Sequence, residues 1–210
     1  MATLLSCANG NTKSDMQIEE PKTKAISPKD EENIIEPQSE LDTLKGSIRA
    51  RTDGMIGNVS MTIRYYSPAV RGRVIWGGLV AYDNVWVTGA HKATSIEFDH
   101  DIKIGKTVVP AGKYAFFTIP SKDQWMIILN KNWNQHLVDD YAQEEDVVRI
   151  NVVPETQVTH QERLRYVIEP ETEKAGEIVI YWEKLEVSVP FEILNRSEEH
   201  TSELQSRQYL

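Results

Sequence analysis

The sequence has few cysteines and no long apolar runs, which are the features that form disulfides and membrane-spanning helices. It has a single cysteine among 210 residues, which excludes an intramolecular disulfide and a zinc site built from several thiolates. No stretch approaches the ~20 consecutive apolar residues of a membrane-spanning helix. Glycine and proline number only 11 and 9, too few for a low-complexity chain. These deficits leave a globular protein of one ordinary domain, with or without tails.

Positive charge is also scarce. The 23 Lys and Arg residues face 32 Asp and Glu residues, so the formal net charge is −9, and no basic cluster interrupts the sequence. Proteins that bind nucleic acid without sequence preference need clustered cations to displace the counterions of the phosphates. The charge balance excludes that class, and we expect no nucleic-acid partner.

Aromatic side chains are missing from residues 1–45 altogether. That segment carries nine acidic residues against five lysines, and Pro21, Pro28 and Pro37 interrupt any helix. So little apolar surface cannot offset the backbone entropy lost on ordering, roughly 1–2 kcal/mol per residue. We predict a disordered acidic tether over 1–45 and one domain over 46–195, which holds 16 of the 17 aromatic residues.

The dominant hydrophobic period within this domain is two residues, which indicates β-strands. Val59–Tyr65 and Leu185–Val189 alternate apolar and polar side chains. Tyr114–Ile119 and Trp125–Leu129 are continuous apolar runs, typical of strands buried on both faces, and we expect them to form a central hairpin. Further strands are expected at 46–52, 73–76, 84–88, 94–98, 102–104, 147–153, 163–169 and 177–182, and one or two helical turns within 133–145. Short strands at this spacing predict an all-β fold, a single antiparallel β-sandwich of jelly-roll type.

Three motifs in the domain are similar to those of a known family. They are Ser67-Pro68-Ala69-Val70-Arg71-Gly72-Arg73, the segment Val85–Thr94, and Pro110–Tyr114 closing at Thr118–Pro120. Together with the ending Trp182–Phe191 they resemble the DUF2911 family, a family of unknown function found largely in Bacteroidota, often with secretory signals. The resemblance covers residues 46–193 and implies a compartment rather than a chemistry. The family usually has Arg at the position of Val87 and Asn at the position of His91, so His91 keeps a hydrogen-bonding group and adds a titratable one.

The N-terminal residues Leu4-Leu5-Ser6-Cys7 resemble a bacterial lipobox, in which the cysteine thiol receives a diacylglyceryl group. An acidic, proline-broken tether directly after Cys7 suits a domain held away from a membrane, and several acyl chains give stable anchoring. A secretory signal needs ~7–15 apolar residues upstream, whereas six residues precede Cys7, so the alternatives are a misplaced start or an unmodified thiol. We predict a lipid-anchored protein of the cell envelope that faces the periplasm or the exterior, with the membrane as its partner.

The last fifteen residues differ again from the domain. Arg196–Ser206 resembles the in-frame translation of a sequencing-library adapter over eleven consecutive residues. The alternative is a genuine polar tail. We interpret 196–210 as an artefactual tail, in which His200 has no role.

The segment from Thr88 to Thr94 is the best candidate for ligand contact, because small residues break the strand pattern there and let a backbone approach a ligand. Trp76 and Trp86 flank it, and their indoles suit stacking on sugars or aromatic ligands. The alternative is that both indoles fill the core, with Gly89 at a bulge. We expect the main concavity to bind a small molecule or a glycan, and to be lined by Trp76, Trp86, Thr88, His91, Thr94 and Asn130.

Signals for catalysis are weak. The acid–base and metal candidates are His91, His100, His136, Asp99 and Asp101, but no His-x-His or His-x-x-x-His spacing occurs. There is no Gly-x-Ser-x-Gly nucleophile elbow, and Cys7 lies far from any structured base. We predict a non-enzymatic binding module without metal or cofactor. The alternative is a hydrolase that uses His91 with a nearby carboxylate.

Overall fold

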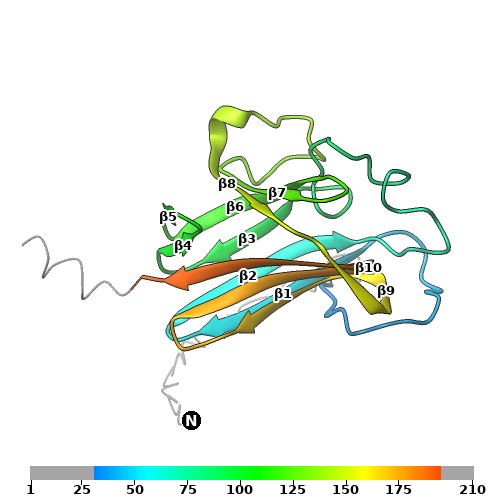
Figure 1. Cartoon of the computed structure of the whole chain (residues 1–210), viewed down its shortest axis with the longest axis horizontal. Helices are drawn as coiled ribbons and strands as arrows, with labels where there is room; N and C mark the ends of the chain where they lie inside the picture. Colours follow the sequence, from blue (N-terminus) through cyan, green and yellow to red (C-terminus); the bar gives the residue numbers. More distant parts are fainter. Residues whose placement is uncertain (1–30, 195–210) are drawn as a thin grey trace, which may run out of the picture. The chain divides into compact units, whose positions relative to one another are not determined.

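A computed structural model describes residues 31–194, which form two antiparallel sheets packed face to face (Figure 1). The six-stranded sheet has the order β1 (Ile48–Ile56), β2 (Val59–Ser67), β3 (Thr94–Phe98), β6 (Gly112–Pro120), β7 (Trp125–Asn130) and β8 (Asp146–Val152). The four-stranded sheet has the order β5 (Thr107–Val109), β4 (Ile102–Ile104), β10 (Ala175–Ile193) and β9 (Glu155–Pro170). The predicted all-β antiparallel sandwich is confirmed.

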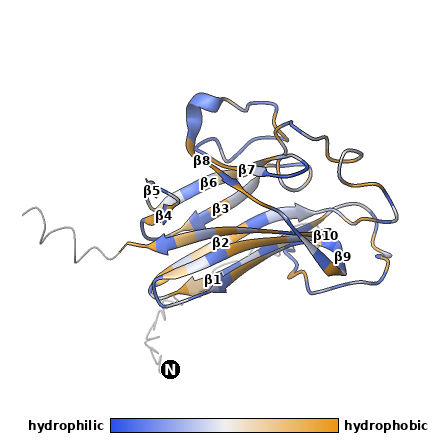
Figure 2. Ribbon diagram, in the orientation of Figure 1, coloured by the Kyte–Doolittle hydropathy of each residue, from blue (hydrophilic) through white to orange (hydrophobic). Residues whose placement is uncertain are grey.

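The core lies between the two sheets, where every second residue of a strand points inward. Hydrophobic and hydrophilic residues alternate along β1 and β2 in Figure 2. The inward residues are fully buried, as for Ile63, Ile96 and Phe116 of one sheet and Ile178 and Val189 of the other. Each such side chain contributes about 1.5–3 kcal/mol by leaving water, which is why the period-two pattern specifies the sandwich.

The predicted central hairpin is present. Strands β6 and β7 pair from Ala115 opposite Asn130 to Pro120 opposite Trp125, with β3 and β8 on either side of them. Their outer face is apolar too, because the loops 83–93 and 131–145 cover it and bury Phe117 and Ile128 in a second hydrophobic cluster. Burial on both faces explains why these two runs are continuous rather than alternating.

Some expected elements differ. Residues 73–76 and 84–88 are loop, with isolated bridges from Trp76 to Val80 and from Trp86 to Thr118. Gly72 and Gly77 adopt φ of 66° and 75°, which turns the chain on both sides of the first run. The expected helical turns within 133–145 reduce to a short 3-10 turn at Gln143–Glu145. The strand β5 has no counterpart in the prediction, and β10 joins two expected strands through an irregularity at Glu183.

Residues 31–45 pack on the sandwich, so the boundary expected at residue 46 lies too late in the chain. Asn33 exchanges backbone hydrogen bonds of 3.0 and 2.9 Å with Arg49 and Arg51 of β1, and Ile35 joins the core. Polar contacts farther along, described below, hold the rest of this stretch. We name residues 33–46 the strap.

Residues 1–30 and 195–210 lie outside the described residues, and with them the expected lipid attachment at Cys7 and the expected artefactual tail. In the part from 31 to 194, no helix is long and apolar enough to cross a membrane.

Candidate functional site

Trp76 and Trp86 join Trp125 and Trp182 in a cluster of four indoles at the edge of the core. The ring centroid of Trp76 lies 4.9 Å from that of Trp125 and 5.6 Å from that of Trp182, and Trp86 stacks on Trp182 at 5.7 Å. Trp125 and Trp182 are buried, while Trp76 and Trp86 are half-buried. Trp76 and Trp86 thus pack against core residues, which was the alternative to a ligand-binding role. Their contact with a ligand stays a prediction.

Thr88 and Thr94 are fully buried and stabilise the loop that follows Trp86. Thr88 has a φ of 50°, a conformation that costs a β-branched residue roughly 1–3 kcal/mol. Its carbonyl oxygen accepts hydrogen bonds from Tyr166 Oη at 2.7 Å and from Thr94 Oγ1 at 3.0 Å, and its own hydroxyl lies 3.0 Å from Thr118 Oγ1. Burial raises the pKa of Tyr166 well above its ordinary value, which keeps this donor protonated. Hydrogen bonds to Tyr166, Thr94 and Thr118 therefore stabilise the strained backbone of Thr88.

His91 lies at the exposed tip of the same loop, also with a left-handed backbone, at a φ of 62°. Its ring packs edge-to-face against Tyr66 with the centroids 5.1 Å apart, and its carbonyl oxygen accepts a hydrogen bond from Leu137 N at 2.8 Å. Within residues 31–194, no carboxylate lies within hydrogen-bonding reach of the His91 ring. The structure thus places this histidine at the surface without the partner that a general base needs.

Asn130 is buried at the end of β7 and holds the loop 131–145. Its Nδ2 donates to Ala142 O at 3.0 Å and to Asp146 Oδ1 at 2.8 Å, and its Oδ1 accepts from Asn132 N at 2.9 Å. Its side-chain hydrogen bonds therefore serve the loop that covers β6 and β7 and the first residue of β8.

The other histidine candidates are paired at the surface. His100 Nδ1 lies 2.8 Å from Asp99 Oδ1, and this hydrogen bond lowers the pKa of Asp99. His136 Nδ1 lies 2.9 Å from Asp139 Oδ2 on the loop 131–145. Across the described stretch, no three His, Cys, Asp or Glu side chains are grouped closely enough to hold a metal ion.

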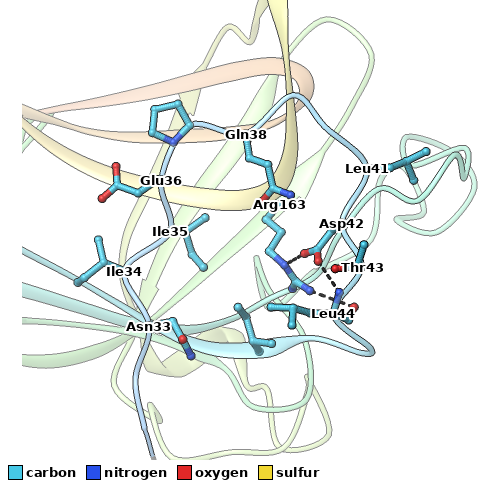
Figure 3. A pocket seen from close by; sticks show the side chains of 12 residues that line it. Asn33, Ile34, Ile35, Glu36, Gln38, Leu41, Asp42, Thr43, Leu44 and Arg163 are labelled. Carbon is cyan, nitrogen blue, oxygen red and sulfur yellow. Dashed lines mark hydrogen bonds and ion pairs between the residues drawn. The ribbon is translucent and has the colours of Figure 1, made fainter.

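A hollow of about 490 Å³ lies elsewhere, between the strap and the start of β1, with Arg163 of β9 at its inner wall (Figure 3). None of the six predicted ligand-binding residues lines it. Its volume falls within the range of small-molecule sites, roughly 300–1,000 Å³. Half of its lining residues are apolar: Ile34, Ile35, Pro37, Leu41, Leu44 and Ile48. We name this hollow the strap pocket.

Arg163 fastens the strap to the sandwich. Its guanidinium pairs with Asp42 through Nε and donates to Ser67 O at 2.6 Å and to Leu44 O at 3.3 Å, and Figure 3 shows Asp42 and Leu44 beside it. The side chains of Arg163 and Asp42 are only 2% and 5% exposed. Burial lowers the pKa of Arg163, yet arginine remains charged at physiological pH. The strap therefore depends on a desolvated ion pair.

The two residues before Arg163 bind the strap as well. Gln161 donates to Glu36 O and accepts from Gln38 N, both at 3.3 Å. The buried Glu162 carboxylate accepts from Asp42 N at 3.4 Å and from Arg71 N at 2.9 Å. Sequence reasoning missed these residues. The one signal was the run of five polar residues from Thr159 to Arg163, which leads into the strand expected at 163–169.

Comparison with known proteins identifies the domain but no relative of established function. No curated protein and no solved structure matches the chain. The family model described as "Protein of unknown function (DUF2911)" matches residues 47–191, which covers β1 and extends into the end of β10. The match spans more than half of the chain and agrees with the motifs noted in the sequence. The protein therefore belongs to the DUF2911 family.

Proposed function

We propose that this protein is a lipid-anchored protein of the cell envelope whose sandwich is a non-enzymatic binding module, with the strap pocket as its ligand site. The strap pocket is the observation that carries the proposal, because a concave surface of about 490 Å³ with aliphatic walls and a few polar groups suits a small ligand. Its aliphatic lining favours a molecule with an apolar part over a sugar that needs an aromatic platform.

The anchoring part of the proposal rests on the sequence around Cys7. The lipobox resemblance and the acidic segment after it support a lipid attached before the domain, and the strap is the first described segment that such a tether would reach. Replacement of Cys7 by Ala should abolish labelling of the full chain by a fatty-acid analogue in a bacterial host. Equal labelling of the Cys7→Ala variant would refute the anchor and leave the pocket untouched.

The hydrolase alternative gains no support from the arrangement at His91. A general base needs an orienting partner and a nearby reacting group, and the ring of His91 contacts an aromatic side chain instead. The hydroxyl groups of Thr88 and Thr94, on the same loop, form hydrogen bonds inside the protein and offer no nucleophile beside His91.

A thermal-shift screen of the full chain tests the pocket, with small amphipathic metabolites in one arm and glycans in the other. A ligand at 100 times its Kd stabilises by about 2.7 kcal/mol. For a domain of this size that raises Tm by roughly 5–11 °C.

Two matched variants locate the site of any ligand found. Leu41→Glu places a charge on a residue that lines the pocket and Val158→Glu places one on a residue that does not, on side chains that are 70% and 98% exposed, so neither should disturb folding. We expect the Tm shift to persist in Val158→Glu and to vanish in Leu41→Glu. A shift that survives in both variants, or an amphipathic arm without hits, would refute the strap pocket as the site.

A further inference from the structure

The buried polar atoms of residues 31–194 that lack a hydrogen-bond partner are unevenly divided between donors and acceptors. Apart from the mutually paired atoms of Asp42 and Arg163, the one acceptor among them is Gln135 Oε1. The rest are N–H groups: Nε and Nη2 of Arg71, and the indole Nε1 of Trp76, Trp125 and Trp182. Native proteins leave few buried donors unpaired, because each costs its full desolvation free energy. Such groups take their acceptors from ordered water or from a bound ligand.

Arg71 stands out within this set because it carries a charge. It lies in the turn after β2 with a φ of 49°, and its backbone N–H donates to Glu162. Its side chain makes no hydrogen bond or ion pair with any residue in 31–194. Arg73, two residues later, differs: its guanidinium donates to the carbonyl oxygens of Val70 and Ala69 and so braces the turn.

The two unpaired nitrogens of Arg71 belong to one edge of the guanidinium. Nε–H and Nη2–H on that edge point in parallel, which is the geometry that accepts two oxygens of a carboxylate, phosphate or sulfate group at once. A guanidinium edge that is shielded from water without an acceptor is unfavourable, whereas the same edge bound to an anion is among the strongest hydrogen-bonding arrangements in proteins.

We propose that the turn 68–73 binds an oxyanion group of a small-molecule ligand through the Nε–Nη2 edge of Arg71. Trp76, on the same loop, offers a further unpaired donor nearby in the chain. Arg71 does not line the strap pocket, so this site stands independently of the proposed function. Both nitrogens are screened from solvent, so the anion must displace part of the loop. Gly72 and Val74 beside it are exposed, so they belong to the part of the loop that an entering anion would displace.

Calorimetric titration of the full chain with sodium acetate, phosphate and sulfate, at constant ionic strength and pH 7, tests the site. We expect saturable binding of at least one oxyanion. Arg71→Met should weaken it at least about tenfold, since hydrogen bonds to a charged group are lost. Arg71→Lys should weaken it less, because an ammonium keeps the charge but not the fork. Lys106→Gln removes a positive charge from an exposed turn and should bind as the unaltered protein does.

Two results would overturn the proposal. One is saturable binding that is equal in Arg71→Met and the unaltered chain, or absent from the unaltered chain for all three anions. The other is a large drop in the Tm of both Arg71 variants in anion-free buffer, which would make Arg71 a structural residue. A ligand site predicts instead that Tm without anion hardly changes, because the Arg71 side chain makes no hydrogen bond or ion pair within residues 31–194.

Discussion

Removal of the Asp42 carboxylate is the most direct way to measure what holds the strap. Asp42→Ala leaves the guanidinium of Arg163, 2% exposed, without its counter-charge and removes the acceptor for Leu44 N at 2.6 Å. Breaking a buried ion pair from one side costs about 3–5 kcal/mol. For a domain of this size that lowers Tm by roughly 6–20 °C.

Urea denaturation followed by circular dichroism at pH 7 gives the free energy of unfolding directly. The midpoint should fall while the slope with urea stays the same, because the surface exposed on unfolding hardly changes. Asp53→Ala is the matched control, since Asp53 pairs with Arg51 at 2.7 Å on the surface, where such pairs contribute about 0–1 kcal/mol. A loss below about 1 kcal/mol in Asp42→Ala, no larger than a surface pair gives, would show that the strap does not depend on this contact.

The double variant Asp42→Ala/Arg163→Met separates the ion pair from the packing of the strap. Replacing both partners by apolar groups is often nearly neutral, so the second change should restore part of the lost stability, with a coupling of about 1–3 kcal/mol. Losses that add up without coupling would mean that the two side chains act separately.

Three further outcomes follow from the described structure. Glu186→Gln should raise Tm at pH 7 and have no effect near pH 4, because burial and then Glu155, Glu169 and Glu177 raise the pKa of Glu186. A raised carboxyl pKa destabilises the fold above that pKa and is harmless once the group is protonated, so equal gains at both pH values would contradict this cause. Amides of Trp125–Leu129 should exchange slowly in hydrogen-exchange measurements, because β7 is paired on both sides, and fast exchange would contradict its central position. His91→Ala should change the free energy of unfolding by less than about 0.5 kcal/mol in denaturant titrations, as at other exposed positions, and a loss of several kcal/mol would show a structural role.

The strands could be predicted wherever burial is a local property of the sequence. β2 alternates because one face meets the core, and β6 and β7 are continuous because loops cover their second face. The expected strand at 73–76 was wrong because glycines turn the chain around it, which outweighs the β-forming tendency of Ile75 and Trp76.

The site was harder to predict because its contacts join distant parts of the chain. The prediction for residues 31–45 rested on their composition, which has few apolar and no aromatic side chains and therefore indicated a disordered tether. The strap is held instead by polar contacts: Asp42 N meets Glu162 across 120 positions, and Gln38 N meets Gln161 across 123. Likewise, the sequence suggests a ligand platform at Trp76 and Trp86, whereas in the fold these indoles pack against Trp125 and Trp182 of other strands. Contacts between residues so far apart in the sequence leave no local sequence pattern from which they could be predicted.

The position of the strap before β1 sets the order in which contacts break when the chain is pulled from its N-terminal side. Within residues 31–194, a pull on the chain from its N-terminal side loads the ion pairs of Glu32 and the two backbone hydrogen bonds of Asn33 first. The contacts of Gln161 and Arg163 follow, and the pairing of β1 with β2 comes last. The fourteen residues from 33 to 46 can then span up to roughly 50 Å while both sheets stay paired. In a domain anchored at its N-terminal side, the strap would therefore detach under force before the two sheets unfold. Its detachment would also remove the strap pocket, because strap residues form most of the lining.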